Sequence, residues 1–359
     1  MAESRARERR PTTNSTAGAA MARVYRLRRF GSLEGIVLHE QRLPAPDPHE
    51  ILVRVRAASL NRRDLMILHQ EYPLPPVLGV VPVSDGAGEV VAVGRDVTRF
   101  EVGDSVTGSY FPRWRDGRLG DDQLDQLGCT VDGMLAEYVL LHEQWAAALP
   151  ADLSWREAAT LTCGGLTAWN ALTSGALVPG ETVLTIGTGS VSTFAVQFAR
   201  LMGLRVIAVT SHGEKAERLT ALGADHVIDS SATPEWGSHV RDLTGGAGVD
   251  LVVETRGPDT IEQSLIASAR YGQIMLLITE NRHARDLVIS GNLYARKLTT
   301  IRRIFAGNRA SLERMIAAIS RAKLRPVIDR TFAFTAARDA YAYLEAGDVF
   351  GNVVIDGAD

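Results

Sequence analysis

The chain has 359 residues, a length that favours two domains over one core. Its 45% hydrophobic and 23% charged residues are ordinary globular values, and a formal net charge of -3 gives no reason to expect a nucleic-acid partner. No uninterrupted apolar stretch is long enough to span a membrane, and two cysteines cannot build a disulfide framework, so a cytoplasmic protein is expected.

Residues 1–20 are polar and rich in arginine, without the apolar centre of a secretory signal. They predict a disordered extension, and Met21 is an alternative start codon. An organellar transit peptide is a rival interpretation, which Glu3 and Glu8 disfavour.

The region from residue 21 to 150 consists of short β-type runs separated by turns. Strands are expected at residues 51–59, 86–94, 102–108 and 134–141. Residues 109–130 interleave aromatic with acidic side chains and are expected to lie on the surface. The pattern predicts a mostly β domain of the partly open barrel type.

From Pro150 onward, helical and strand patterns alternate. A helix over 155–172 is predicted to start with a capping box formed by Ser154 and Glu157. Further strands are expected at residues 182–187, 205–210, 226–229, 249–255 and 273–279, and helices at 190–203, 215–224 and 260–269. This alternation predicts a doubly wound parallel sheet over residues 151–320. A last β-run at 350–355 is predicted to return to the first domain, which therefore comprises residues 21–150 and 321–359.

The turn after the first strand of this sheet is typical of a dinucleotide site. Gly187 permits a tight turn, and Gly189 lets a pyrophosphate approach the backbone. The helix opening at Ser190 and Val191 offers amide groups and a positive dipole to the phosphates, and the small Ser192 stands at the third glycine position. The alternative is a glycine-rich turn that binds nothing.

The second strand of the sheet ends without the acidic residue that usually holds the ribose of NAD. Ser211 and Lys215 could contact a 2′-phosphate instead, and Arg218 follows one turn later. NADPH is therefore favoured over NADH. The alternative is that Lys215 and Arg218 form an ordinary solvated helix face.

Several segments together resemble the medium-chain dehydrogenase/reductase superfamily from about Met21 to Ile355. They are SLNRRDL (59–65), SDGAGEVVAVG (84–94), VGDSV (102–106), DGMLAEYV (132–139), AATLTCGGLTAWNAL (158–172), ALGADHVID (221–229), GGAGVDLVVET (245–255) and FGNVVI (350–355). The resemblance implies an α/β fold in which a GroES-like catalytic domain is split around a Rossmann domain. It also implies a cleft between the two domains and, commonly, a homodimer.

Zinc-dependent alcohol dehydrogenases of this superfamily have a cysteine at the position of Asn61 and a histidine at that of Ser84; only their third ligand is matched, by Cys163. One thiolate cannot hold a tetrahedral zinc ion. The four-cysteine structural zinc lobe is missing as well, and His69 and His142 lack ligand spacing. No metal is expected.

The zinc-free branch resembles quinone reductases, in which NADPH delivers hydride to a conjugated carbonyl, enone or quinone-like small molecule. The resemblance places Asn61 near the nicotinamide ribose, Thr167 at the carboxamide and Asn352 among the cofactor-binding residues. It places Tyr72 in the substrate cleft, where its hydroxyl could donate a proton or a hydrogen bond. The structural alternatives are a turn cap for Asn61, a helix interior for Thr167 and loop packing for Tyr72. Asp64 and Asp85 are expected to be structural ion-pair or turn residues, and Cys163 a small buried hydrophobe.

Three positions depart from the family pattern, because Ser190, Arg256 and Thr279 stand where glycine or another small residue is usual. Arg256 could pair with the cofactor phosphate or fill the space the cofactor needs. The second hypothesis is therefore a redox-inactive cyclase, lyase or small-molecule binding protein. In either case the partners expected are a small molecule and a second copy of the chain, with neither nucleic acid nor membrane.

Overall fold

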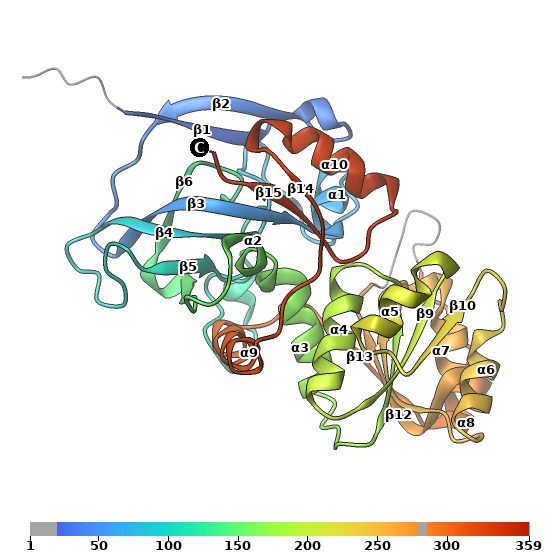
Figure 1. Cartoon of the computed structure of the whole chain (residues 1–359). Coiled ribbons are helices and arrows are strands. Elements are labelled where there is room, and N and C mark those ends of the chain that lie inside the picture. Colours follow the sequence, from blue (N-terminus) through green and yellow to red (C-terminus); the bar gives the residue numbers. More distant parts are fainter. Residues whose placement is uncertain (1–19, 279–285, 359) are drawn as a thin grey trace, which may run out of the picture.

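The computed structural model describes residues 20–278 and 286–358, in which two β-sheets form the centres of two lobes (Figure 1). The catalytic lobe has a seven-stranded sheet in the order β14-β15-β3-β4-β5-β7, with β6 paired to β3. Its strands are β3 (Glu50–Leu60), β4 (Asp85–Val93), β5 (Ser105–Gly108), β6 (Tyr138–His142), β7 (Ala146–Ala148), β14 (Ile328–Phe332) and β15 (Asn352–Asp356). A hairpin of β1 (Met21–Leu27) and β2 (Ile36–Arg42) and the helices α1 (Arg62–Leu68) and α10 (Ala337–Ala346) complete the lobe.

The Rossmann lobe contains six parallel strands in the order β10-β9-β8-β11-β12-β13. They are β8 (Thr182–Ile186), β9 (Arg205–Thr210), β10 (His226–Asp229), β11 (Val249–Glu254), β12 (Ser268–Leu276) and β13 (Thr300–Arg303). The helices are α3 (Leu166–Thr173), α4 (Ser190–Leu201), α5 (Ala216–Leu222), α6 (Trp236–Leu243), α7 (Ile261–Ala267), α8 (Gly291–Lys297) and α9 (Arg309–Ala322).

Helices cover both faces of the Rossmann sheet because the central strands are apolar on both sides. In β8, Val183 belongs to the core beneath α3, α4 and α9, whereas its neighbour Leu184 belongs to the core beneath α6 and α7. Each strand therefore contributes alternate side chains to two separate hydrophobic layers. This arrangement keeps the carboxyl ends of β8, β9 and β11 at one edge of the sheet.

The closing strand β15 confirms the predicted return of the chain to the first domain. It pairs antiparallel with β3, from Val353 opposite Leu60 to Asp356 opposite Ala57, and parallel with β14. The catalytic sheet is thus assembled from both ends of the chain. Among the described residues, no helix is both long and apolar enough to cross a membrane.

Two predicted elements differ from the structure. The helix expected over 155–172 is interrupted: α2 (Trp155–Ala158) does begin at the Ser154 capping box, but a π-helical turn at Leu161–Gly165 separates it from α3. At this break the Cys163 backbone amide donates a long-range hydrogen bond to Asp85 Oδ2, at 3.0 Å.

The segment 109–130 was expected at the surface, and that prediction is wrong for its two ends. Tyr110, Phe111, Gln126 and Leu127 are buried, although residues 115–118 are exposed. Their burial follows from tertiary contacts with Arg63 and Phe305, which the local polarity of the segment conceals.

Candidate functional site: a phosphate loop between two lobes

The turn joining β8 to α4 has the geometry of a phosphate-binding loop. Gly187 adopts a positive φ of 83°, which a side chain would disfavour. Gly189 is the N-cap of α4, and a Cβ built on it would meet no atom within 4 Å. The Ser192 hydroxyl donates to the Ile186 carbonyl at 2.6 Å and ties the helix to the strand. The opening of α4, where Val191 follows Ser190, is therefore fixed in place and accessible to an anion.

Ser190 fills a space that another glycine provides. A Cβ on Gly164, in the π-helical turn, would lie 1.9 Å from the Ser190 oxygen. That hydroxyl is buried and has no hydrogen-bond partner in the described structure. The serine that replaces the usual glycine is therefore accommodated by Gly164, and its donor capacity is unused.

The end of β11 bears a buried carboxylate rather than an open glycine. Glu254 accepts the backbone amides of Arg256 and Gly257 at 2.8 and 2.9 Å and the Thr260 hydroxyl at 2.7 Å. The Arg256 side chain is about half exposed and lies 3.2 Å from Asp259. Arg256 is thus engaged in a surface ion pair. Thr279, the third departure from the family pattern, lies outside the described residues.

The tip of β9 differs from the solvated face considered as an alternative. Lys215 is buried, and its Nζ lies 2.6 Å from Asp348 Oδ1. The Arg218 guanidinium lies 3.9 Å from the centre of the Phe350 ring and 3.5 Å from Asp329. Both cations therefore contact the C-terminal part of the catalytic lobe. Ser211 is exposed, with its hydroxyl 3.1 Å from the His212 ring.

The resemblance described above places Asn61, Ser84 and Cys163 at the positions of the zinc ligands of alcohol dehydrogenases. Asn61 caps α1, and its backbone amide donates to Asp64 Oδ2 at 2.8 Å. Ser84 donates to Asp85 Oδ1 at 2.7 Å, and the second oxygen of Asp85 accepts the Cys163 amide. Burial raises the pKa of the Cys163 thiol well above its ordinary value.

A tetrahedral zinc site takes thiolate, imidazole or carboxylate ligands. Of these three positions only Cys163 offers such a ligand, because Asn61 and Ser84 carry an amide and a hydroxyl. Burial also raises the pKa of Asp85 to about 7, against the opposing hydrogen bonds from Ser84 and the Cys163 amide. The positions of Asn61, Ser84 and Cys163 therefore do not fit zinc. Elsewhere among the described residues, a metal-compatible trio occurs at the exposed side chains of His212, Glu214 and Asp348.

Tyr72 belongs to a network that sequence analysis only partly identified. Its hydroxyl donates to Gln126 Oε1 at 2.6 Å and lies 2.5 Å from the Tyr110 hydroxyl. The Arg63 guanidinium lies 5.3 Å and 4.7 Å from the centres of the Tyr72 and Tyr110 rings and donates to Gln126 Oε1 at 3.3 Å. Because Arg63 has only donors, the Gln126 atom that faces Arg63 and Tyr72 is the side-chain oxygen. Tyr72 therefore donates its proton to Gln126 and accepts the proton of Tyr110.

The network lies beside the Cys163 position. Cys163 packs against the aromatic cluster of Tyr110, Phe111 and Phe305. Burial raises the pKa of Tyr72, while the positive charge of Arg63 acts in the opposite direction. The only sequence signal for Tyr110 was an aromatic pair inside a polar segment, and Arg63 was hidden among other arginines.

Thr167 and Asn352, the two other residues predicted to bind the coenzyme, are both buried. The Thr167 hydroxyl donates to the Cys163 carbonyl at 2.7 Å, within the helix. Asn352 donates from Nδ2 to the Val327 carbonyl at 2.8 Å, and its Oδ1 has no partner in the described structure. Its neighbour Gly351 forms a β-bridge with Gly189 of the phosphate loop. Their proposed contacts with a cofactor remain predictions.

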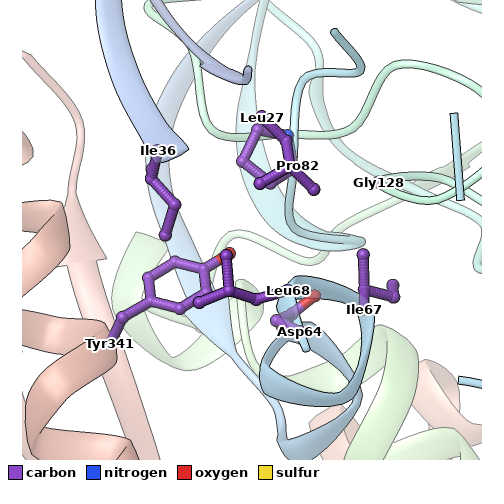
Figure 2. Close-up of a pocket in the computed structure, with 8 residues that line it drawn as sticks. All are labelled: Leu27, Ile36, Asp64, Ile67, Leu68, Pro82, Gly128 and Tyr341. Atoms are coloured by element: carbon purple, nitrogen blue, oxygen red, sulfur yellow. The ribbon is translucent and has the colours of Figure 1, made fainter. Parts of the chain in front are cut away.

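Asp64 lies behind this cluster, next to a small, mostly apolar pocket of the catalytic lobe (Figure 2). The pocket is lined by Leu27, Ile36, Asp64, Ile67, Leu68, Pro82, Gly128 and Tyr341. Burial raises the pKa of Asp64 to about 6, and its neighbours Arg63 and the Asn61 amide oppose that shift. The geometry gives Asp64 a structural role at the start of α1.

A Rossmann sheet with an open phosphate loop, joined to a β-rich lobe built from both chain ends, defines the two-domain class of nicotinamide-dependent oxidoreductases. Comparison with family models agrees: residues 47–151 match the alcohol dehydrogenase GroES-like domain, and residues 190–321 match the zinc-binding dehydrogenase domain. The chain belongs to the medium-chain dehydrogenase/reductase superfamily, whose members depend on NAD(P), and it is an oxidoreductase of the alcohol dehydrogenase type.

The relatives span nearly the whole chain. A zinc-type alcohol dehydrogenase-like protein of Schizosaccharomyces pombe is 40% identical over 316 residues, covering 86% of this chain and 91% of the relative. A solved structure of an NAD-dependent alcohol dehydrogenase is 33% identical, with a TM-score of 0.85 and coverage of 93% and 99%. A quinone oxidoreductase of Pseudomonas syringae is 27% identical, with a TM-score of 0.79 and the same coverage.

Proposed function

We propose that this protein is a zinc-independent reductase that uses NADPH to reduce a conjugated carbonyl, enone or quinone-like small molecule. The observation that carries the proposal is the chemistry at Asn61, Ser84 and Cys163, where an amide and a hydroxyl leave a single thiol in place of a zinc-binding set. Without a metal to polarise an alcohol, hydride transfer to an already electron-poor double bond is the reaction that needs least help from side chains.

The loop Gly187–Ser192 would hold the pyrophosphate of the coenzyme at the opening of α4. Asn61 and Thr167 would border the nicotinamide end, and Ser211 and Lys215 the 2′-phosphate. A bound nicotinamide supplies the hydride, and the protein supplies orientation.

The Tyr72 network would serve the oxygen of the substrate. Hydride addition to a conjugated carbonyl leaves negative charge on its oxygen, which a nearby hydroxyl donor stabilises. In the free protein both protons are donated within the network, so Tyr72 would donate to the substrate by releasing Gln126 Oε1, while Arg63 supplies a positive charge beside the two rings. The network therefore offers an electrophilic environment in the absence of a metal ion.

The proposal is tested on the purified full-length protein. We expect less than about 0.1 zinc per chain by elemental analysis, and an unchanged melting temperature after chelator treatment. Millimolar NADPH should raise the melting temperature, because a ligand that binds only the folded state stabilises it. NADPH consumption is then measured with quinones, enones and simple ketones.

Stoichiometric zinc that is required for activity would refute the metal-free assignment. Consumption of NADPH with simple ketones alone would refute the substrate class. An absence of binding with both NADPH and NADH would instead favour the redox-inactive alternative. A homodimer and a cytoplasmic location stay predictions for this protein.

A further inference from the structure

The segment 348–351, which connects α10 to β15, borders the proposed coenzyme site (Figure 1). Its Gly351 amide donates to the Thr188 carbonyl at 2.8 Å, and Gly351 bridges to Gly189. The Val349 carbonyl accepts the Thr188 hydroxyl at 2.9 Å. A piece of the catalytic lobe is therefore bonded directly to the phosphate loop.

The same segment reaches the tip of β9. Asp348 Oδ1 lies 2.6 Å from Lys215 Nζ, and this nitrogen also lies 3.4 Å from the Val349 carbonyl. The Lys215 side chain is only 7% exposed, whereas that of Asp348 is 72% exposed. The lysine charge is thus covered on the solvent side by a carboxylate from the other lobe.

The tip of β9 is the place where this fold positions the adenosine ribose and any phosphate on its 2′-oxygen. Lys215 is the buried cation there, but Glu214 and Asp348 both bring negative charge to it. Carboxylate oxygens of these two residues and a ring nitrogen of His212 all lie within 4.8 Å of one another, and the three side chains are exposed. A 2′-phosphate would therefore meet a lysine that is already neutralised and a surface that repels it.

We propose that Asp348 is a specificity-determining residue that competes with the 2′-phosphate of NADPH for Lys215. Asp348 holds the lysine in the free protein, and NADPH binds by taking Lys215 from it. NADH lacks the phosphate and leaves the pair intact. The proposal rests on the proposed function, because it assumes that a nicotinamide coenzyme binds at the phosphate loop.

The test measures dissociation constants for NADPH and NADH by titration calorimetry on the full-length protein. Asp348→Asn should tighten NADPH binding about two- to fivefold, the range expected when an exposed ion pair no longer competes. Its affinity for NADH should change less than about twofold, because no phosphate is involved. Lys215→Met should weaken NADPH at least about tenfold through loss of a charge-assisted contact, with NADH nearly unaffected.

A matched control comes from the far end of β15. Asp356 also pairs with an arginine, at 2.7 and 2.8 Å from Arg156, but it lies at the opposite end of β15 from the phosphate loop. Asp356→Asn should leave both coenzyme affinities unchanged. A general effect of removing one negative charge would appear equally in this variant, and that result would overturn the proposal.

The double variant Lys215→Met with Asp348→Asn separates competition from simple repulsion. If Asp348 acts through Lys215, removing its charge should have little further effect once the lysine is gone. A full gain in NADPH affinity in the methionine background would overturn the partner exchange. Parent protein that binds neither coenzyme would refute the proposed function itself, whereas tight NADPH binding unaffected by Asp348→Asn would refute only the role of Asp348.

Discussion

The two parts of the proposed cleft differ in what their polar groups bond to. At the phosphate loop, Gly189 faces open space and the Ser190 hydroxyl lacks a partner among the described residues. Around Tyr72, hydroxyl, amide and guanidinium groups bond to one another, and of that network Arg63 Nε and Gln126 Nε2 are buried without a partner among the described residues. The loop offers donors to a ligand, whereas the tyrosine network is bonded mainly within itself.

This difference indicates which part of the site depends on the coenzyme. An opening helix with free amides gains most when an anion binds. A buried polar network that is bonded within itself contributes mainly to the stability of the fold, because burying its members unpaired would be costly. Mutations should therefore change stability in the network and binding at the loop.

The largest expected effect is on stability, from Arg63→Met in the network. Its guanidinium is buried and donates to the Leu127 carbonyl at 3.0 Å as well as to Gln126. Losing one member of a buried charged cluster typically costs about 3–5 kcal/mol, which urea unfolding would measure. Arg95→Met is the control, since this side chain is 81% exposed and should change the free energy of unfolding by less than about 0.5 kcal/mol. Equal small changes in both variants would show that the network does not stabilise the fold.

At the loop, Gly189→Val should weaken binding of NADPH at least about 100-fold, because the added side chain occupies the space that the phosphates approach. The melting temperature should barely change, since the glycine has a negative φ and nothing lies within 4 Å of the new Cβ. Gly291→Val is a matched control, because Gly291 also has open space at the first turn of a helix. An unchanged NADPH affinity in Gly189→Val would place the coenzyme elsewhere.

A smaller effect is expected for Tyr110→Phe, which removes one hydroxyl from the network and leaves the rings in place. Loss of its bond to Tyr72 should cost about 1–2 kcal/mol of unfolding free energy. Tyr271→Phe should cost less than about 0.5 kcal/mol, because Tyr271 is 73% exposed. If the two variants unfold at the same urea concentration, the hydroxyl pair does not contribute to stability.

The smallest effect concerns pH and Lys297, far from both regions. Burial, with the charges of Arg241 and Arg270, lowers the pKa of Lys297 to about 8. The folded protein then releases this proton before the unfolded chain does, so the group adds stability as pH rises from about 8 towards the unfolded value near 10.4. Lys297→Met should lack this rise, so the difference in free energy of unfolding between parent and variant should grow over this pH range. A difference that stays constant over this pH range would contradict the shift.

Much of the fold was predictable because its signals are local. The run from β8 through α4 to β9 was located within two residues, since buried strands, a glycine turn and an amphipathic helix follow one another directly. The break at Leu161–Gly165 was not predictable, because it depends on Asp85, which lies 78 residues from Cys163. Strands β1, β2, β7, β13 and β14 were not identified, because their sequences gave no distinct pattern.

The site was predictable where backbone geometry defines it and obscure where long-range pairing does. The turn at Gly187 and Gly189 was predicted from the strand before it and the helix and strand after it, and its role in binding a coenzyme stays a prediction. Lys215 was predicted to contact a 2′-phosphate, with a solvated helix face as the alternative. It is buried against Asp348, and no local pattern connects two residues so far apart in the chain. Tyr72 was singled out, but its partners Tyr110 and Gln126 lie in a segment whose polarity suggested the surface.

The central claim is that the amides opening α4 receive the phosphates of a nicotinamide coenzyme, and calorimetric titration of the parent protein with NADPH tests it most directly. The account predicts saturable binding of one NADPH per chain, lost in Gly189→Val and retained in Gly291→Val. Flat heats with NADPH and NADH alike, or equal binding by the parent and Gly189→Val, would contradict it.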